Sequence, residues 1–489
     1  MNLYIGVDLG TSAVKCLLVD AAGAIVKETS REYPLDFPQP GWSQQDPADW
    51  VTGTMDALGE LLEGADKAAV RGIGVGGQMH GLVALDEKGQ VLRPAILWND
   101  GRTQAETDYL NDQVGKGVLT ERTGNIAFAG FTAPKLLWME KNEPELFAAI
   151  HKIMLPKDYL VYHFTGQHTC DPSDASGMLL YDVANRRWSK EMLEVCHLRE
   201  SQMPTVHESW EPVGMLKSDV AAALGLSPDV VVCAGAGDNA AAAVGCGIVG
   251  PGKCNISLGT SGTVFITSDT FSVDPQNALH AFAHADGGWH QMGCILSAAS
   301  CNKWWMDILD TEDYAAQQKD IHALGKNPVY FLPYLMGERS PHNDVSARSA
   351  FVGMSMDTPR HQMTQAVLEG VAFAIRDCVE AAKSQGIAIE TSMLCGGGAK
   401  SPLWRRILAS VLAIPLTIPK TEQGPAYGGA ILAAVAAGDF DSVESCCGQW
   451  VEVADTVQPD PALTQKYETQ YRRWHTLYPA LKNFYQDGQ

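Results

Sequence analysis

The sequence predicts an α/β protein built from two related domains. Its 489 residues exceed the roughly 250–300 residues over which one hydrophobic core keeps growing, so two cores are expected. Strand-like and helical patterns alternate along both halves, and a short motif recurs half a chain later. We therefore place one domain at 1–246 and the other at 247–489, with a hinge in the glycine-rich segment 246–253.

The composition limits the kinds of partner. Apolar residues make up 46% of the chain and charged residues 19%, as in an ordinary folded protein. The net charge of −21 argues against DNA, RNA and anionic membranes, because these ligands select clustered Lys and Arg. We expect a small-molecule substrate, with any phosphate held locally by backbone amides, hydroxyls or a metal ion.

Two features favour a cytoplasmic protein. The first residues lack the basic and apolar regions of a signal peptide, and no later segment approaches ~18 consecutive apolar residues. The 12 cysteines include no CxxC pair, which is typical of reduced thiols rather than of a disulfide or zinc framework.

The recurring motif predicts two similar hairpins. Tyr4 to Asp20 reads YIGVDLGTSAVKCLLVD, and Lys253 to Asp269 reads KCNISLGTSGTVFITSD. Each copy has an apolar β-rich run, a Gly-Thr-Ser turn and a second β-rich run. Either the turn is simply favourable turn chemistry, or the glycine lets a ligand approach while the Thr and Ser groups donate to phosphate. Duplication favours the second interpretation, in which two hairpins hold one polyphosphate.

Further elements follow in chain order. Apolar β-rich runs predict strands near 4–34 and 70–97, and an amphipathic pattern predicts helices within 134–150. A strand at 230–234 precedes a glycine turn and an alanine-rich helix, and a long helix is expected over 363–384.

Gly72 to Gly77 (GIGVGG) matches the GxGxxG pattern of dinucleotide-binding oxidoreductases. In those enzymes the motif opens a helix that points at the pyrophosphate. Here the segments 82–86 and 91–98 resemble strands around a turn at 87–89, so an oxidoreductase is disfavoured.

Two aspartates suit phosphoryl transfer, which needs a carboxylate near the acceptor hydroxyl and a divalent ion on the phosphates. Asp238 follows the glycine turn at a helix start, where it is either a general base or only an N-cap. Asp8 ends the first strand beside the Gly-Thr-Ser turn, where it either holds hydrated magnesium or is a solvated strand end.

On these motifs the chain resembles the carbohydrate kinases, a family that includes glycerol, gluconate, ribulose and xylulose kinases. The resemblance covers nearly the whole chain and rests on Asp8 to Ser12 (DLGTS), Gly130 to Asn142 (GFTAPKLLWMEKN), Gly235 to Asn239 (GAGDN), Ser257 to Gly262 (SLGTSG), Gln365 to Gly370 (QAVLEG) and Gly396 to Ala399 (GGGA). It implies two actin-like ATPase domains of the ribonuclease H-like type, with the active site in a cleft between them.

Within the family, the chain looks most like the bacterial xylulose kinases. The supporting strings are Gly77 to Gly81 (GQMHG), Ile96 to Arg102 (ILWNDGR) and Leu332 to His342 (LPYLMGERSPH). This implies ATP-dependent phosphorylation of D-xylulose to D-xylulose 5-phosphate. Glycerol is disfavoured, since glycerol kinases have an Arg-Glu pair where Met79 and His80 stand here. A kinase for another ketose or polyol is the alternative.

The resemblance also implies roles for individual residues. Asp238 becomes the general base, and Met79, His80 and Asn239 contact the sugar, although a lone histidine such as His80 is commonly structural. Some relatives use an arginine in the region that is 123–132 here, and this chain has none there. Such kinases are often dimers, so a homodimer is expected.

ATP and Mg²⁺ are the implied cofactors. Asp8 is the proposed metal ligand and second catalytic residue, and the expected nucleotide-binding residues are Gly10, Thr11, Ser12, Lys15, Gly259, Thr260, Gly397 and Gly398. For Lys15, an exposed strand position is the alternative to a phosphate contact.

Other residues are expected to be structural. Ser401 precedes Pro402 and suits an N-cap, and the glycines of 424–429 suit close helix packing. His280, His284 and His290 lack the HExxH pattern of a zinc site.

An actin-like ATPase that acts as a switch would need the same two hairpins. Only a sugar kinase needs an acceptor base beside a polar pocket, so Asp238 and Asn239, together with Met79 and His80, distinguish the two hypotheses.

Overall fold

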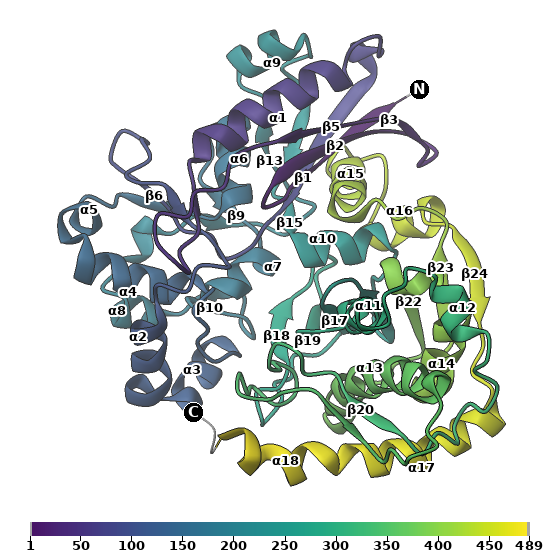
Figure 1. Ribbon diagram of the computed structural model, residues 1–489. Coiled ribbons are helices and arrows are strands. Elements are labelled where there is room, and N and C mark those ends of the chain that lie inside the picture. The colour runs from purple at the N-terminus through teal and green to yellow at the C-terminus, as the bar shows by residue number, and fades with distance from the viewer. Residues whose placement is uncertain (1, 487–489) are drawn as a thin grey trace.

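The computed structural model describes residues 2–486 and contains two large mixed sheets (Figure 1). The first sheet has the order β13-β14-β5-β1-β2-β3, with β15 paired to β5. Its strands are β1 Leu3–Leu9, β2 Ala13–Asp20, β3 Ile25–Glu32, β5 Val70–Gly77, β13 Pro212–Met215, β14 Val231–Cys233 and β15 Ala236–Gly237.

The second sheet has the order β18-β19-β17-β16-β22-β23-β24. Its strands are β16 Lys253–Leu258, β17 Gly262–Ser268, β18 His280–Ala283, β19 Trp289–Ile295, β22 Thr391–Cys395, β23 Leu416–Pro419 and β24 Val453–Val457.

The two sheets repeat one arrangement, as the duplicated motif predicts. In the first, β3, β2 and β1 are antiparallel neighbours, and β1, β5 and β14 are parallel. In the second, β19, β17 and β16 are antiparallel, and β16, β22 and β23 are parallel. The Gly-Thr-Ser motif forms the turn of the β1–β2 hairpin and of the β16–β17 hairpin, so both predicted hairpins are confirmed.

Short strands and helices surround the sheets. The short strands are β4 Gln44–Gln45, β6 Val83–Leu85, β7 Ala95–Ile96, β8 Lys152–Met154, β9 Thr169–Cys170, β10 Tyr181–Asp182, β11 Arg187–Trp188, β12 Thr205–Val206, β20 Tyr330–Leu332 and β21 Ala350–Val352. The helices before residue 246 are α1 Pro47–Leu61, α2 Gln104–Asp108, α3 Lys116–Thr123, α4 Thr132–Asn142, α5 Pro144–Ala148, α6 Pro156–Thr165, α7 Pro172–Ala175, α8 Lys190–Val195, α9 Ser218–Leu224 and α10 Asp238–Gly245. The later ones are α11 Ala299–Ile308, α12 Tyr314–Gln318, α13 Arg360–Ser384, α14 Pro402–Leu412, α15 Gly424–Ala436, α16 Val443–Trp450, α17 Pro461–His475 and α18 Leu477–Gln486.

Helix α10 lies between the two sheets (Figure 1). On one side it contacts α15, β5 and β15. On the other, Ala243 and Cys246 at its carboxyl end belong to a buried cluster with Phe265 of β17 and Met393 of β22. Helix α10 is therefore held at the junction of the two halves.

Glycines allow α15 to approach the first sheet and α10. A Cβ atom on Gly428 would lie 1.9 Å from the carbonyl oxygen of Ala241 in α10. One on Gly74 of β5 would lie 2.1 Å from the carbonyl oxygen of Gly429. The close packing expected for 424–429 is confirmed, and the GxGxxG string lies inside β5, where it packs against α15 rather than opening a helix.

Three expected elements differ in detail. The helical segment near 134–150 is two helices, because Pro144 begins α5 and cannot continue the backbone hydrogen bonds of α4. The strand-like segments at 82–98 form only β6 and β7, which pair with β8 and β4. The long helix expected over 363–384 is α13, which begins three residues earlier, at Arg360.

Within residues 2–486, no helix combines the length and the apolar character that a membrane crossing requires. The 12 cysteines all carry free thiols.

Candidate active site

Asp238 is the first residue of α10, and Gly237 occupies the N-cap position. Its Oδ1 accepts hydrogen bonds from the Asn239 backbone N–H at 2.7 Å and from Asn239 Nδ2 at 2.9 Å. Among the described residues, Oδ2 receives no hydrogen bond from the protein. Asp238 is therefore not the N-cap, and one carboxylate oxygen is left for a ligand.

Burial raises the pKa of Asp238 to about 6, although the two hydrogen bonds from Asn239 oppose the shift. A carboxyl group with this pKa is largely ionised at neutral pH and still binds a proton readily. These are the properties of a general base.

Asp8 lies near the carboxyl end of β1, in register with Lys15 of β2 and Gly76 of β5. Burial, and to a lesser extent the negative charge of Asp238, raise the pKa of Asp8 to about 7, although the charge of Lys15 opposes the shift. The structure therefore brings the two predicted catalytic carboxyl groups close enough for their charges to interact.

This pair of carboxylates fits a magnesium ion only together with a phosphate ligand. No group of three or more His, Cys, Asp or Glu side chains within residues 2–486 could form a metal cage. Mg²⁺ is commonly held by one or two carboxylates, water and substrate phosphates, and it would offset the repulsion between Asp8 and Asp238.

The turn of the first hairpin is fixed by one backbone hydrogen bond and by two neighbouring side chains. The Gly10 N–H donates to the Ala13 carbonyl at 3.1 Å, and the Tyr33 hydroxyl donates to the Gly10 carbonyl. Thr11 Oγ1 accepts from Trp98 Nε1 at 2.9 Å, while Ser12 is exposed.

Lys15 makes polar contacts within the protein rather than lying free on the strand. Its Nζ donates to Gln423 Oε1 and lies 3.5 Å from Glu28 Oε2. Gln423 directly precedes α15, so this contact joins the first hairpin to the second half of the chain.

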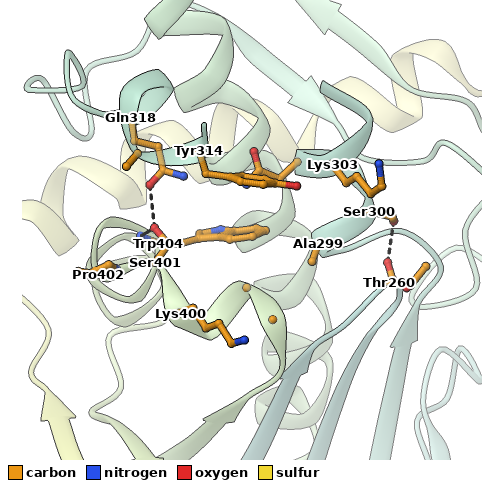
Figure 2. Close-up of a pocket in the computed structure, with 14 residues that line it drawn as sticks. Thr260, Ala299, Ser300, Lys303, Tyr314, Gln318, Lys400, Ser401, Pro402 and Trp404 are labelled. Atoms are coloured by element: carbon orange, nitrogen blue, oxygen red, sulfur yellow. Dashed lines mark hydrogen bonds between the residues drawn. The ribbon is translucent and has the colours of Figure 1, made fainter. Parts of the chain in front are cut away.

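The second hairpin borders a cavity of about 630 Å³ (Figure 2). Carbonyl oxygens of its turn cap α11, since Gly259 accepts from the Ala299 N–H at 2.8 Å and Thr260 accepts from Ser300 Oγ at 2.6 Å. Thr260 lines the cavity together with Gly397 and Gly398. The structure thus brings together three of the residues that the sequence assigns to the nucleotide.

Backbone forms one edge of this cavity. A Cβ atom on Gly397 would meet no atom within 4 Å, whereas one on Gly398 would lie 2.9 Å from both Leu258 and Trp404. Ser401 lines the same cavity and is the N-cap of α14, because its Oγ accepts from the Trp404 N–H at 3.2 Å. The predicted N-cap is confirmed.

Sequence reasoning missed the aromatic and basic residues of the cavity. Figure 2 shows Tyr314 and Trp404 on opposite sides of it, with Lys303 and Lys400 also on its border. Tyr314 and Lys303 come from helices that no quoted motif covers, and Trp404 has the periodicity of a core residue. Only the position of Lys400, directly after the GGGA string, offered a signal.

Met79 and His80 follow β5 on the other side of Asp238. Met79 is buried, and a Cβ atom on Gly237 would lie 2.9 Å from its Sδ. His80 has a φ of 70°, a left-handed conformation that is costly for a residue with a side chain and is typical of functional sites.

The His80 ring is held as a neutral hydrogen-bond acceptor. Burial, and to a lesser extent the positive charge of Lys135, lower its pKa to about 3. Nδ1 lies 2.8 Å from the Gly177 carbonyl and must therefore carry the proton. Nε2, which has no hydrogen-bond partner among the described residues, can accept a hydrogen bond from a hydroxyl group.

An aromatic wall that the sequence did not predict extends from His80. Phe131 stacks on His80 at 4.7 Å between ring centroids, and Phe128 lies 5.4 Å from Phe131 and 5.1 Å from His280. His280 comes from β18, so this wall contains residues of both halves. His290 stacks on Phe265 and also contacts Phe282, which lies beside His280, whereas His284 lies against the Ile248 carbonyl.

Comparison with known proteins covers almost the whole chain. Residues 3–245 match the N-terminal domain, and residues 254–437 the C-terminal domain, of the FGGY family of carbohydrate kinases. A xylulose kinase of Escherichia coli strain K12 is 41% identical over 486 residues, which cover 98% of this chain and 99% of that protein.

Solved structures agree with the architecture. A structure described as a xyloylose kinase from Brucella ovis has a TM-score of 0.93 and 43% identity, covering 99% of this chain and 100% of that one. A xylulose kinase from Rhodospirillum rubrum has a TM-score of 0.93 and 30% identity, covering 99% and 100%. The predicted two-domain fold of the actin-like type is confirmed.

Proposed function

Because the chain belongs to the FGGY family of carbohydrate kinases, we propose that it transfers the γ-phosphoryl group of ATP to D-xylulose, giving D-xylulose 5-phosphate. The substrate follows from the xylulose kinases that resemble this chain over nearly its full length. The chemistry is argued from the residues of the site.

The single observation that carries the proposal is the environment of Asp238. It begins α10 at the junction of the two halves, with one carboxylate oxygen free and a pKa of about 6. In the proposed reaction the free carboxylate oxygen of Asp238 accepts the proton of the terminal sugar hydroxyl. At the same time the hydroxyl oxygen bonds to the γ-phosphorus of ATP, and ADP leaves.

The sugar is oriented by groups next to the base. Asn239 directs its amide nitrogen to Asp238, which leaves its carbonyl oxygen to accept from a neighbouring hydroxyl. His80 Nε2 accepts from another hydroxyl, and Met79 supports the floor beneath them by packing on Gly237. A neutral acceptor suits an uncharged sugar, because it makes a hydrogen bond without burying a charge.

The nucleotide is proposed to occupy the cavity beside the second hairpin. Its base stacks between Tyr314 and Trp404, and its phosphates run toward the two Gly-Thr-Ser turns, where backbone N–H groups and hydroxyls donate to them. Asp8 would hold Mg²⁺ through its carboxylate, and the ion would supply charge stabilisation across the phosphates. Lys15 keeps its contact with Gln423 and positions the first turn.

A coupled ADP-release assay across pentuloses, hexuloses, polyols and gluconate tests the substrate. D-Xylulose is expected to give the highest kcat/KM, with the phosphate on the terminal hydroxyl by ³¹P NMR. A higher kcat/KM for ribulose, gluconate or glycerol would change the assigned substrate but leave the assignment as a sugar kinase intact. No sugar-dependent ADP release at all would contradict the proposal.

Two further expectations complete it. We place the enzyme in the cytoplasm, because its reaction consumes ATP and ATP is available there. Assembly as a homodimer stays a prediction, which sedimentation at several protein concentrations would test.

A further inference from the structure

Arg339 is held at a fixed place by the residues on either side of it. The Glu338 carboxylate accepts from the backbone N–H groups of Leu296 at 2.9 Å and of Arg339 itself at 2.8 Å. Ser340 Oγ donates to the Ala278 carbonyl at 2.7 Å and accepts from the Cys294 N–H at 2.9 Å. Both neighbours are buried, so the backbone of this loop is attached to the second sheet.

The side chain of Arg339 extends from this loop to the aromatic wall beside His80. Its guanidinium carbon lies 5.3 Å from the ring centroid of Phe128, a residue of the first half. Phe128 is also in contact with Phe131, which stacks on His80. The positive charge of Arg339 acts on this region, because it contributes to the lowered pKa of both His80 and His280.

The N–H donors of the Arg339 guanidinium have no acceptors among the described residues. Among residues 2–486, the guanidinium forms no ion pair with a carboxylate and no hydrogen bond, and it contacts the Phe128 ring. In Glu338, the adjacent acid, Oε1 accepts from backbone N–H groups and Oε2 is buried without a hydrogen-bond partner among the described residues, so neither oxygen pairs with the guanidinium. Other arginines with buried or partly buried side chains differ, since Arg102 pairs with Asp100 and Arg186 with Glu208. A half-buried arginine without acceptors, fixed by its neighbours, is suited to bind a ligand rich in oxygen.

We propose that Arg339 is a sugar-binding residue supplied by the second half of the chain, and that its guanidinium donates to hydroxyl or carbonyl oxygens of the sugar bound against His80. This inference rests on the proposed function, because it takes the same pocket as its starting point. The ligand is the sugar rather than the nucleotide, since Arg339 lies on the wall of Phe128 and His280 and is absent from the lining of the cavity beside Thr260 and Gly397.

A contact of this kind links sugar binding to the arrangement of the two halves. His80 and Asp238 approach the sugar from the first half, and Arg339 approaches it from a loop attached to the second sheet. A sugar that bonds to both sides favours the state in which they are close.

Three variants test the inference: Arg339→Ala, Arg339→Lys and, as a matched control, Arg348→Ala. Arg348 lies in the same connection but is exposed, and within the described part of the chain its side chain donates only to the carbonyls of Val345 and Ala347. KM for D-xylulose and for ATP, kcat, and the Kd for D-xylulose without ATP by calorimetry are measured for each protein.

Arg339→Ala is expected to raise KM and Kd for D-xylulose about 10- to 100-fold, the effect of losing a hydrogen bond from a charged donor. KM for ATP should change less than threefold, roughly the error of such comparisons. Arg339→Lys should recover part of the sugar affinity because it keeps the charge but not the planar donor pattern. Arg348→Ala should match the wild type.

Unchanged sugar affinity in a folded Arg339→Ala protein would overturn the inference, and so would a rise confined to KM for ATP. If the Ala variant folds poorly, analogues of D-xylulose that each lack one oxygen keep the test decisive. The analogue without the oxygen that Arg339 contacts has no such bond to lose. The loss of affinity from wild type to Arg339→Lys must therefore be smaller for that analogue than for D-xylulose. Wild-type protein that phosphorylates no sugar would instead contradict the proposed function.

Discussion

At the scale of the residue, Asp238 carries the chemistry. Asp238→Asn keeps the acceptor for the two Asn239 hydrogen bonds and removes the base. We expect kcat to fall by about 10²- to 10⁴-fold with KM for ATP nearly unchanged. A matched control is Asp219→Asn, which changes an exposed aspartate in the first turn of α9. Normal turnover of the Asp238→Asn variant would show that Asp238 is not the general base.

The same substitution is expected to stabilise the fold. Burial raises the pKa of Asp238 from 3.8 to about 6, so the ionised carboxylate destabilises the native state. This penalty is complete above about pH 6 and disappears as the pH falls toward 3.8. In metal-free buffer at pH 8, Asp238→Asn should raise the free energy of unfolding by up to about 3 kcal/mol. Urea unfolding should show this gain shrinking at pH 4.5, and a loss of stability at pH 8 would contradict the assigned environment.

The activity should depend on pH in the same range. A base must be deprotonated, so kcat/KM for the sugar should fall about tenfold per pH unit below pH 6. Initial rates from pH 4.5 to 8 with the sugar limiting and ATP saturating measure this profile. A flat profile across pH 6 would mean that another group, or none, takes the proton.

Sequence reasoning located residues whose chemistry is tied to local backbone. The Gly-Thr-Ser motif depends only on a hairpin, and Ser401 depends only on the start of a helix. Asp238 depends only on a strand followed by a turn and a helix. The structure contains each of these elements. Tyr314 and Arg339 had no such signal, because their importance arises from what lies opposite them in space. The partner of Lys15, more than 400 positions along the chain, could not be seen for the same reason.

At the scale of the element, the contact between α10 and α15 depends on missing side chains. A methyl group on Gly428 would lie 1.9 Å from the Ala241 carbonyl oxygen, and that backbone cannot move without displacing α10. Gly428→Ala should therefore lower the free energy of unfolding by about 1–3 kcal/mol, although alanine favours helices.

Gly448→Ala in α16 is the control, because a Cβ atom there meets no atom within 4 Å. This variant should be stabilised by about 0.5–1 kcal/mol. Equal effects of the two substitutions in urea unfolding would mean that α10 and α15 are not in close contact.

Strands and helices were predictable to the extent that their patterns were regular. The paired sheets follow from the duplicated motif, and α13 from its long apolar periodicity. The division into α4 and α5 follows from Pro144, which the amphipathic pattern alone conceals. The short strands β6 and β7 pair with distant segments, which no local pattern reveals.

At the scale of the whole molecule, the segment 246–253 is proposed as the hinge. Gly247, Gly250 and Gly252 all have positive φ values between 70° and 78°. The segment is tied to the second half, since Asp286 accepts from the Gly250 N–H at 2.7 Å. We expect D-xylulose with a non-hydrolysable ATP analogue to reduce the radius of gyration in X-ray scattering, as domain closure excludes water. Superimposable profiles with and without ligands would count against closure.

The most direct test of the account is the rate of ATP consumption by the purified protein with and without D-xylulose. A sugar kinase whose base faces the acceptor hydroxyl should hydrolyse ATP slowly alone and accelerate by about 10²-fold or more when the sugar is present, because positioning the acceptor lowers the barrier. An actin-like switch would consume ATP at the same rate in both conditions, and that result would contradict the account.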